Sequence, residues 1–319
     1  MRDQALNFPR RVPNGGRFPQ DAGDGVSAPA GEHIPDASTR FKLAAPLNLG
    51  QTLAFARMGS GDPCLRMIDG WLWRATRTPQ GLATERIGLT SDGVVEVAAW
   101  GSGAQWLVAR APALCGALDD PSAFAPEQPL LRQLVRCHPG LRIGRTEAVF
   151  ETAVLVTLEQ RIATREAWSN WRSLVRALGE PAPGPLVGLW APPSPEKIAR
   201  TSYEVFHRFG IERRRADLIR HLGVVARRLE ETVSLPLEAA YRRFRSIPGV
   251  GPWTSARIGM IALGDADAVA VGDLHLPHLV SWALAGERRG SDERMLELLE
   301  PYRGHRARVI RLLLAGFRR

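Results

Sequence analysis

The sequence predicts an α+β protein in which a small antiparallel-sheet domain is followed by an all-helical domain. The chain has 319 residues, more than one domain of roughly 100–200 residues usually holds. Between residues 47 and 100, short apolar runs that alternate in polarity are separated by Gly, Pro and Asp, a pattern typical of strands and turns. From about Pro129 onward, apolar residues recur three and four positions apart, as they do along one face of a helix.

The predicted boundaries follow changes in composition. Residues 1–43 are rich in Gly, Pro, Asp and Arg and lack apolar periodicity, so we expect a flexible basic tail. Residues 44–120 form the predicted sheet domain, with one helix over 103–115 packed on the sheet. Residues 121–319 form the predicted helical domain, which a Pro-rich connection at 181–195 interrupts. The expected strands lie in the runs LNLGQTLAF, CLRMIDG, GWLWRATRT, ATERIGLT and VVEVAAW.

The charge of the chain indicates a polyanionic partner. Apolar residues make up 45% and charged residues 24% of the sequence, which is ordinary for a globular protein and excludes a mostly disordered or fibrous one. The net charge is +9, and residues 197–319 hold 22 basic and 14 acidic side chains, a net of +8. Strongly basic proteins most simply bind nucleic acid. The chain has 40 arginines but only two lysines, Lys42 and Lys197, so these two are the only candidates for an amine side-chain nucleophile.

The cysteines and the apolar runs bear on cofactors and location. Cys64, Cys115 and Cys137 are widely spaced and match no zinc or iron–sulfur pattern. So few cysteines without a disulfide framework favour a reducing compartment. No apolar run approaches the ~20 residues of a membrane span, and the first residues lack the apolar core of a signal peptide. The sequence therefore predicts a cytoplasmic protein without a membrane segment.

The most informative segment is Leu235–Pro277, which contains IPGVGPWTSA. An apolar helix is expected to end near Phe244, two glycines two positions apart permit a tight hairpin, and Pro252 is typical of the first turn of a second helix. Backbone N–H groups at a helix N-terminus suit a DNA phosphate. The segment predicts a helix-hairpin-helix that binds DNA, with a plain helical packing unit as the alternative. The predicted DNA contacts are Arg245, Gly249, Val250, Gly251, Trp253, Thr254 and Arg257.

Three acidic residues lie in the otherwise apolar loop GDADAVAVGDLHLP that follows. Asp265 and Asp267 are typical turn formers. Asp273 follows a run of Ala and Val and precedes Leu274 and Leu276. A carboxylate in such surroundings is costly unless it caps a helix or takes part in chemistry. From the residues alone, capping and catalysis are both open for Asp273.

These motifs resemble the helix-hairpin-helix glycosylase superfamily of base-excision repair, most closely bacterial 3-methyladenine DNA glycosylase II. The hallmark is a helix-hairpin-helix, a loop with Gly and Pro, and then an aspartate, and Asp273 stands at that position. The resemblance spans about residues 47–317, although only 245–273 is specific. It implies a TBP-like N-terminal domain and a catalytic role for Asp273. Leu158–Gln160 resembles the family's glutamine-containing helix entry, which places Arg161 near the wedge that fills the gap left by the extruded base, without the usual apolar side chain.

One departure from the superfamily bears on mechanism. Members that also cleave the strand carry a lysine two positions after the second hairpin glycine, where this chain has Trp253. Neither Lys42, in the predicted tail, nor Lys197, after the Pro-rich connection, lies in a recognisable site. The resemblance therefore implies a monofunctional glycosylase that extrudes an alkylated purine of the 3-methyladenine or 7-methylguanine type and leaves an abasic site. The carboxylate of Asp273 would stabilise the oxocarbenium-like sugar.

The remaining site residues rest on the same resemblance. Trp253 and Trp282 are the candidates for stacking on the extruded base, with core packing as the alternative for each. The superfamily often binds a monovalent cation through hairpin carbonyls, which here are those of Arg245, Ile247 and Val250 and would hold a structural Na⁺ or K⁺. No cofactor is expected to be required, and no iron–sulfur cluster. The expected partner is double-stranded DNA with damaged bases, bound by a monomeric, nucleoid-associated enzyme.

Two other functions are open from the sequence. The first is a non-catalytic helix-hairpin-helix protein that only binds DNA. The second is an oxidised-base glycosylase with lyase activity, which Trp253 disfavours because an indole cannot attack the sugar as an amine does.

Overall fold

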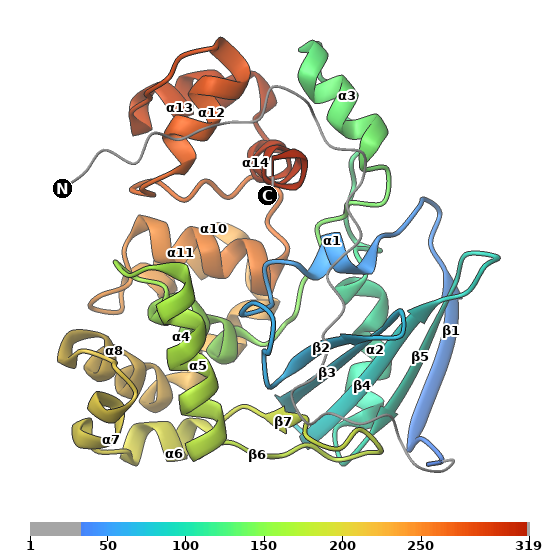
Figure 1. Ribbon diagram of the computed structural model, residues 1–319, viewed down its shortest axis with the longest axis vertical. Helices are drawn as coiled ribbons and strands as arrows, with labels where there is room; N and C mark the ends of the chain where they lie inside the picture. Colours follow the sequence, from blue (N-terminus) through green and yellow to red (C-terminus); the bar gives the residue numbers. More distant parts are fainter. Residues whose placement is uncertain (1–32, 318–319) are drawn as a thin grey trace.

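A five-stranded antiparallel sheet forms the N-terminal domain of the computed structural model, which describes residues 33–317 (Figure 1). Strands β2 to β5 form a meander, and β1 pairs with the free edge of β5, so the order is β1-β5-β4-β3-β2. The predicted antiparallel sheet is therefore confirmed. The strands are β1 (Ala37–Lys42), β2 (Leu65–Ile68), β3 (Trp71–Thr78), β4 (Gly81–Leu89) and β5 (Val94–Trp100).

The two faces of the sheet pack against different elements. Alternate residues of β5, Val95 and Val97, point into an apolar core that includes α2 (Ala104–Leu114), the helix predicted over 103–115. On the opposite face, the rings of Trp73 and Trp100 stack with centroids 5.6 Å apart. The Pro-rich connection of the helical domain covers these rings and contributes the short strands β6 (Glu180–Pro181) and β7 (Trp190–Ala191).

The structure corrects the predicted tail. Strand β1 lies within the 1–43 segment that the composition assigned to a flexible tail, and all six of its residues pair with β5. Ala37 is buried, and Thr39 and Phe41 are half-buried, whereas the residues between them are exposed. This alternation is short and mostly polar, which is why composition alone missed the strand. Lys42 is thus a strand residue, and residues 1–32 of the predicted tail lie outside the described residues.

A second correction concerns the first expected strand. The run LNLGQTLAF contains the helix α1 (Leu49–Leu53) instead. The side chain of Asn48 accepts a hydrogen bond from the Gln51 N–H at 2.9 Å, which caps the helix. Leu49 and Leu53 are four positions apart and both are buried, as one face of a helix requires.

The helical domain has two apolar cores, which Figure 1 shows as a lower cluster of helices and an upper one. The first helical core contains side chains of helices α4 to α11, and the second contains those of α3, α12, α13 and α14. Within residues 33–317, no helix is long and apolar enough to cross a membrane. The helices are α3 (Pro129–Cys137), α4 (Val149–Leu158), α5 (Thr164–Leu178), α6 (Pro195–Arg200), α7 (Tyr203–Arg208), α8 (Arg213–Val224), α9 (Ala226–Glu230), α10 (Leu237–Arg245), α11 (Pro252–Ile258), α12 (Leu276–Ala285), α13 (Asp292–Leu299) and α14 (Arg306–Gly316).

The loop between α11 and α12 connects the two helical cores. Asp265 accepts a hydrogen bond from the Tyr241 hydroxyl at 2.5 Å, which ties the loop to the first core. Asp267 forms an ion pair with Arg306 of α14 at 2.5 Å, which ties it to the second. Oδ1 of Asp265 also accepts the N–H of Asp267 at 2.8 Å, which confirms Asp265 as a turn former. Asp267 lies within this turn, but its side chain binds α14 instead.

Candidate active site

The predicted helix-hairpin-helix is present between α10 and α11. Gly249 has a φ of +93°, and a β-carbon there would lie 3.1 Å from a methyl carbon of Leu218. The Val250 N–H donates to the Ile247 carbonyl at 3.0 Å and closes the turn. Gly251 is exposed, and a β-carbon there would meet nothing within 4 Å. The first glycine is thus needed for the turn, whereas the second leaves an open surface at the start of α11.

Gln160 joins the end of α4 to the hairpin. Its Nε2 donates to the Gly249 carbonyl at 3.2 Å and to the Thr254 hydroxyl at 2.8 Å. Arg161 follows directly, is exposed and has a left-handed φ of +57°. The structure therefore places Arg161 next to the hairpin, where the resemblance puts the wedge, and its contact with DNA stays a prediction.

The carboxylate of Asp273 is held by three hydrogen bonds. Oδ1 accepts the N–H of His275 at 2.8 Å and that of Leu276 at 3.0 Å, at the N-terminus of α12. Oδ2 accepts the indole N–H of Trp253 at 2.9 Å. Asp273 therefore does cap a helix, and the third bond joins it to the hairpin. The half-buried side chain still reaches solvent, so capping and chemistry do not exclude each other here.

Arg257, for which the sequence predicts a DNA contact, forms an ion pair within the protein, so its contact with DNA stays a prediction. Its Nη2 lies 2.6 Å from Oε2 of Glu159, and both side chains are mostly buried. The guanidinium also lies over the rings of Phe55, at 5.5 Å, and Trp253, at 5.9 Å. Arg257 thus packs inside the site with its charge neutralised by Glu159. Arg245, by contrast, is exposed on α10 and donates to the Ser255 hydroxyl at 3.2 Å, so its DNA contact stays a prediction.

Phe55 and Arg311 are site residues that the sequence analysis missed. Phe55 comes from the sheet domain, just after α1, and is half-buried. The guanidinium of Arg311, from α14, lies 4.7 Å from its ring centroid and donates to the Thr52 carbonyl at 2.8 Å. Phe55 of the sheet domain thus lies against Arg311 of α14 and against Arg257 of α11, and Arg257 also lies over Trp253. Neither periodicity nor a local motif could signal this, because the contact with Arg311 spans more than 250 positions.

The second predicted stacking residue is not brought to Asp273. Trp282 lies edge-on against Phe317 in the second helical core, with ring centroids 4.9 Å apart. It is six positions into α12, which is about 9 Å along the helix axis from the end that Asp273 caps. Trp253 is therefore the predicted stacking residue that lies beside Asp273, Trp282 packs on Phe317 at a distance from it, and contact of either ring with an extruded base stays a prediction.

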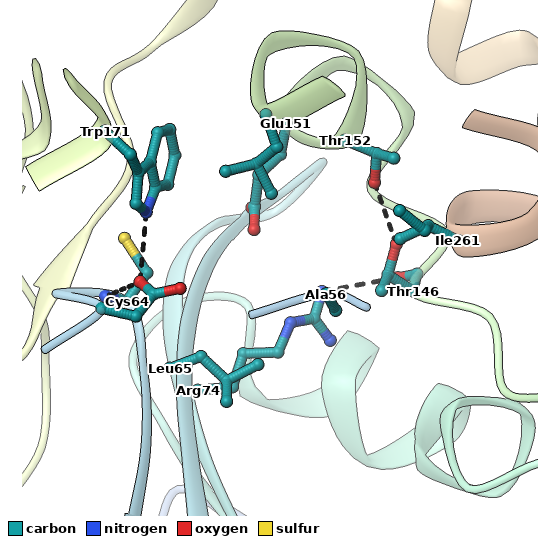
Figure 2. A pocket seen from close by; sticks show the side chains of 11 residues that line it. Ala56, Cys64, Leu65, Arg74, Thr146, Glu151, Thr152, Trp171 and Ile261 are labelled. Atoms are coloured by element: carbon teal, nitrogen blue, oxygen red, sulfur yellow. Dashed lines mark hydrogen bonds between the residues drawn. The ribbon is translucent and has the colours of Figure 1, made fainter. Parts of the chain in front are cut away.

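A small cavity that does not include Asp273 or Trp253 lies where β2, β3, α4 and α5 meet (Figure 2). Asp62 accepts N–H groups of Met58 at 2.7 Å and Cys64 at 2.9 Å, and the Trp171 indole at 3.1 Å. Burial nevertheless raises the pKa of the Asp62 carboxyl, and it raises the pKa of the Cys64 thiol well above its ordinary value. The thiol is thus a poor nucleophile. The lining residues are Ala56, Asp62, Cys64, Leu65, Arg74, Thr146, Glu151, Thr152, Leu155, Trp171 and Ile261.

Two curated relatives match about half of the chain, and no family model matches it. A probable bifunctional transcriptional activator/DNA repair enzyme AlkA of Mycobacterium tuberculosis is 34% identical over 167 residues, 49% of this chain and 32% of that protein. A putative DNA-3-methyladenine glycosylase YfjP of Bacillus subtilis is 23% identical over 172 residues, 52% of this chain and 58% of that protein. The chain thus spans about a third of the first relative and just over half of the second.

Solved structures match most of the chain. A 3-methyladenine DNA glycosylase from Archaeoglobus fulgidus superposes with a TM-score of 0.74 at 22% identity, over 86% of this chain and 97% of that one. An apo 8-oxoguanine glycosylase/lyase of Clostridium acetobutylicum gives 0.67 at 14% identity, over 88% and 96%. In sequence the chain is thus related to one protein named as a probable DNA repair enzyme and one named as a putative DNA-3-methyladenine glycosylase, and it shares its fold with the two solved glycosylases.

Proposed function

We propose that the protein is a monofunctional DNA glycosylase that removes alkylated purines from double-stranded DNA and leaves an abasic site. The observation that carries the proposal is the carboxylate of Asp273, which is fixed at the start of α12 and bonded to Trp253 of the hairpin. The names of the two curated relatives support DNA repair and 3-methyladenine as the lesion class. The enzyme acts as a monomer on DNA of the nucleoid.

The proposed reaction is hydrolysis of the N-glycosidic bond of an extruded nucleotide. Stacked bases are out of reach in a duplex, so the damaged nucleotide must leave the helix. The bond between C1′ and the purine nitrogen breaks, and both electrons go to the base. A purine methylated at N3 or N7 carries a positive charge, which these electrons neutralise. The carboxylate of Asp273 stabilises the cationic sugar. A water oxygen then bonds to C1′, and its proton passes to the carboxylate and on to solvent.

The lysines of the chain support hydrolysis without strand cleavage. A lyase needs an amine that bonds to C1′. Lys42 is exposed on β1 and Lys197 is exposed on α6, while Trp253 takes the position after the hairpin. The 8-oxoguanine glycosylase/lyase shares the fold of this chain at 14% identity. Strand cleavage requires a lysine just after the hairpin, and this chain has Trp253 at that position.

The hairpin carbonyls of Arg245, Ile247 and Val250 are proposed to hold a structural Na⁺ or K⁺. Neutral carbonyl oxygens are ligands that hard cations accept. Ile247 and Val250 bound the turn that the hydrogen bond between them closes, and Arg245 ends α10 just before it. When bound, the ion adds positive charge beside the phosphate-facing surface. The proposed chemistry at C1′ does not need it.

Duplexes that each carry one lesion test the proposed function. We expect the purified protein to release 3-methyladenine or 7-methylguanine without nicking the strand, and we expect Asp273→Asn to abolish release while DNA binding persists. A nick before alkali treatment, or an adduct trapped by borohydride, would instead identify an oxidised-base lyase. If wild type releases no base, and Asp273→Asn binds DNA as tightly as wild type does, the protein only binds DNA.

A further inference from the structure

We infer that Trp253 is a positioning residue whose indole N–H orients the Asp273 carboxylate so that Oδ2 is the oxygen that acts in the reaction. The inference deepens the proposed function and rests on it. The sequence assigned Trp253 to DNA contact and base stacking, neither of which requires its N–H.

The hydrogen bonds of Asp273 distinguish its two oxygens. A carboxylate offers about four lone-pair sites, two on each oxygen. Oδ1 accepts the N–H groups of His275 and Leu276, which occupy both of its sites. Oδ2 accepts only the Trp253 indole among the hydrogen bonds described for this side chain. One site on Oδ2 is therefore left for the water or the cationic sugar.

The orientation of the indole is set by its surroundings. Trp253 stands in the first turn of α11, directly after Pro252, and packs against the first helical core. The guanidinium of Arg257 lies 5.9 Å from its ring centroid, and Glu159 holds that guanidinium at 2.6 Å. The donor that faces Oδ2 is thus anchored through α4 as well as α11. Such anchoring fixes a catalytic group before substrate binds.

The loop before Asp273 is anchored from the opposite side. Gly272 has a φ of +89°, and its N–H donates to Oδ2 of Asp292, in the first turn of α13, at 2.9 Å. The Gly272 hydrogen bond fixes the backbone before Asp273, and the Trp253 indole fixes Oδ2. Together they hold the carboxylate in one orientation. Without the indole N–H, the bonds to α12 still hold Oδ1, but Oδ2 loses its partner and the charged form loses a stabilising donor.

Matched variants at position 253 test the inference. Trp253→Phe keeps an aromatic ring and removes the N–H, Trp253→His restores a ring N–H, and Trp106→Phe on α2 is the control. Single-turnover release of 7-methylguanine from a methylated duplex is measured with enzyme in excess. Affinity is measured on a duplex that carries a tetrahydrofuran abasic analogue.

We expect Trp253→Phe to lower the rate constant about 10- to 100-fold, as loss of a hydrogen bond to a charged group does. Affinity should stay within about twofold of wild type, and Trp253→His should recover part of the rate. A wild-type rate in Trp253→Phe, or a loss confined to affinity, would overturn the inference.

A readout on the free protein separates this inference from the proposed function. The indole N–H resonance of Trp253, assigned with Trp253→Phe, should move upfield in Asp273→Asn, because a hydrogen bond to a charged carboxylate is stronger than one to a neutral amide. This shift in the absence of base release by wild type would refute the proposed function and leave the contact intact. Base release by wild type in the absence of this shift would refute the positioning role alone.

Discussion

Glu159 and Arg257 form an ion pair, 2.6 Å between Oε2 and Nη2, that joins the end of α4 to α11. Their side chains are 21% and 15% exposed, so water screens the pair only partly. The same guanidinium lies over the ring of Phe55 from the sheet domain. The pair therefore connects the segment before Arg161, the helix of Trp253 and the N-terminal domain.

Glu159→Gln tests whether this pair supports the fold of the site. The variant leaves a mostly buried guanidinium without its carboxylate, which should lower the free energy of unfolding by about 1–3 kcal/mol. The double variant Glu159→Gln/Arg257→Gln should lose less free energy of unfolding than the losses of Glu159→Gln and Arg257→Gln added together, because it buries no uncompensated charge. Urea unfolding of all four proteins measures this. Additive losses would show that the two side chains act independently.

The two hairpin glycines should respond differently to alanine. Gly249→Ala places a β-carbon at a φ of +93° and 3.1 Å from Leu218, so it should cost about 1–3 kcal/mol of stability. Gly251→Ala has an ordinary φ of −89° and no atom within 4 Å, so stability should change by less than about 0.5 kcal/mol. Its methyl group instead faces the surface at the start of α11, and DNA affinity should fall.

Thermal unfolding and DNA titration at two salt concentrations separate these effects. If the hairpin contacts phosphate as proposed, Gly251→Ala weakens binding while melting like wild type. Equal DNA affinity for Gly251→Ala and wild type would show that no DNA phosphate binds at the start of α11.

The features that the sequence predicted correctly depend on near neighbours in the chain. The hairpin needs only its glycines and Pro252. The cap at Asp273, one of the two roles that the sequence left open, needs only the N–H groups two and three positions further along. The site itself depends on distant contacts, which a single sequence does not encode visibly. The sequence does not indicate that Arg257 pairs with Glu159, or that Phe55 packs against Arg311. Sequence alone does not distinguish an arginine on a DNA-facing surface from one inside a packed site.

Arg161→Gly should separate function from stability. A non-glycine residue at a φ of +57° costs about 1 kcal/mol, so the glycine variant should be as stable as wild type or more stable by about that amount. Its base release should nevertheless fall, because the side chain proposed to fill the gap in the duplex is gone. Arg161→Lys is the control that keeps a long cationic side chain. Unchanged release by Arg161→Gly would remove Arg161 from the wedge role.

Glu230 makes the stability of α4 depend on pH. Its Oε1 and Oε2 accept the N–H groups of Phe150, at 2.7 Å, and Val149, at 3.1 Å, in the first turn of α4. Burial raises the pKa of this carboxyl from its ordinary 4.5 to about 7, against the lowering effect of these two bonds. Between these two values the folded protein binds more protons than the unfolded chain, so stability falls as pH rises.

The glutamine variant isolates this effect from the buried acids Asp62, Glu85 and Glu151, whose pKa values burial also raises. Wild type should lose about 2–3 kcal/mol through Glu230 between pH 4.5 and 7, with no further loss from this group above pH 8. Glu230→Gln has the shape of the protonated side chain, so it should match wild type near pH 5 and show a shallower decline. Urea unfolding at pH 5, 6, 7 and 8 measures both slopes. If the slopes are equal, the two N–H donors of α4 keep Glu230 ionised throughout, and their hydrogen bonds outweigh its burial.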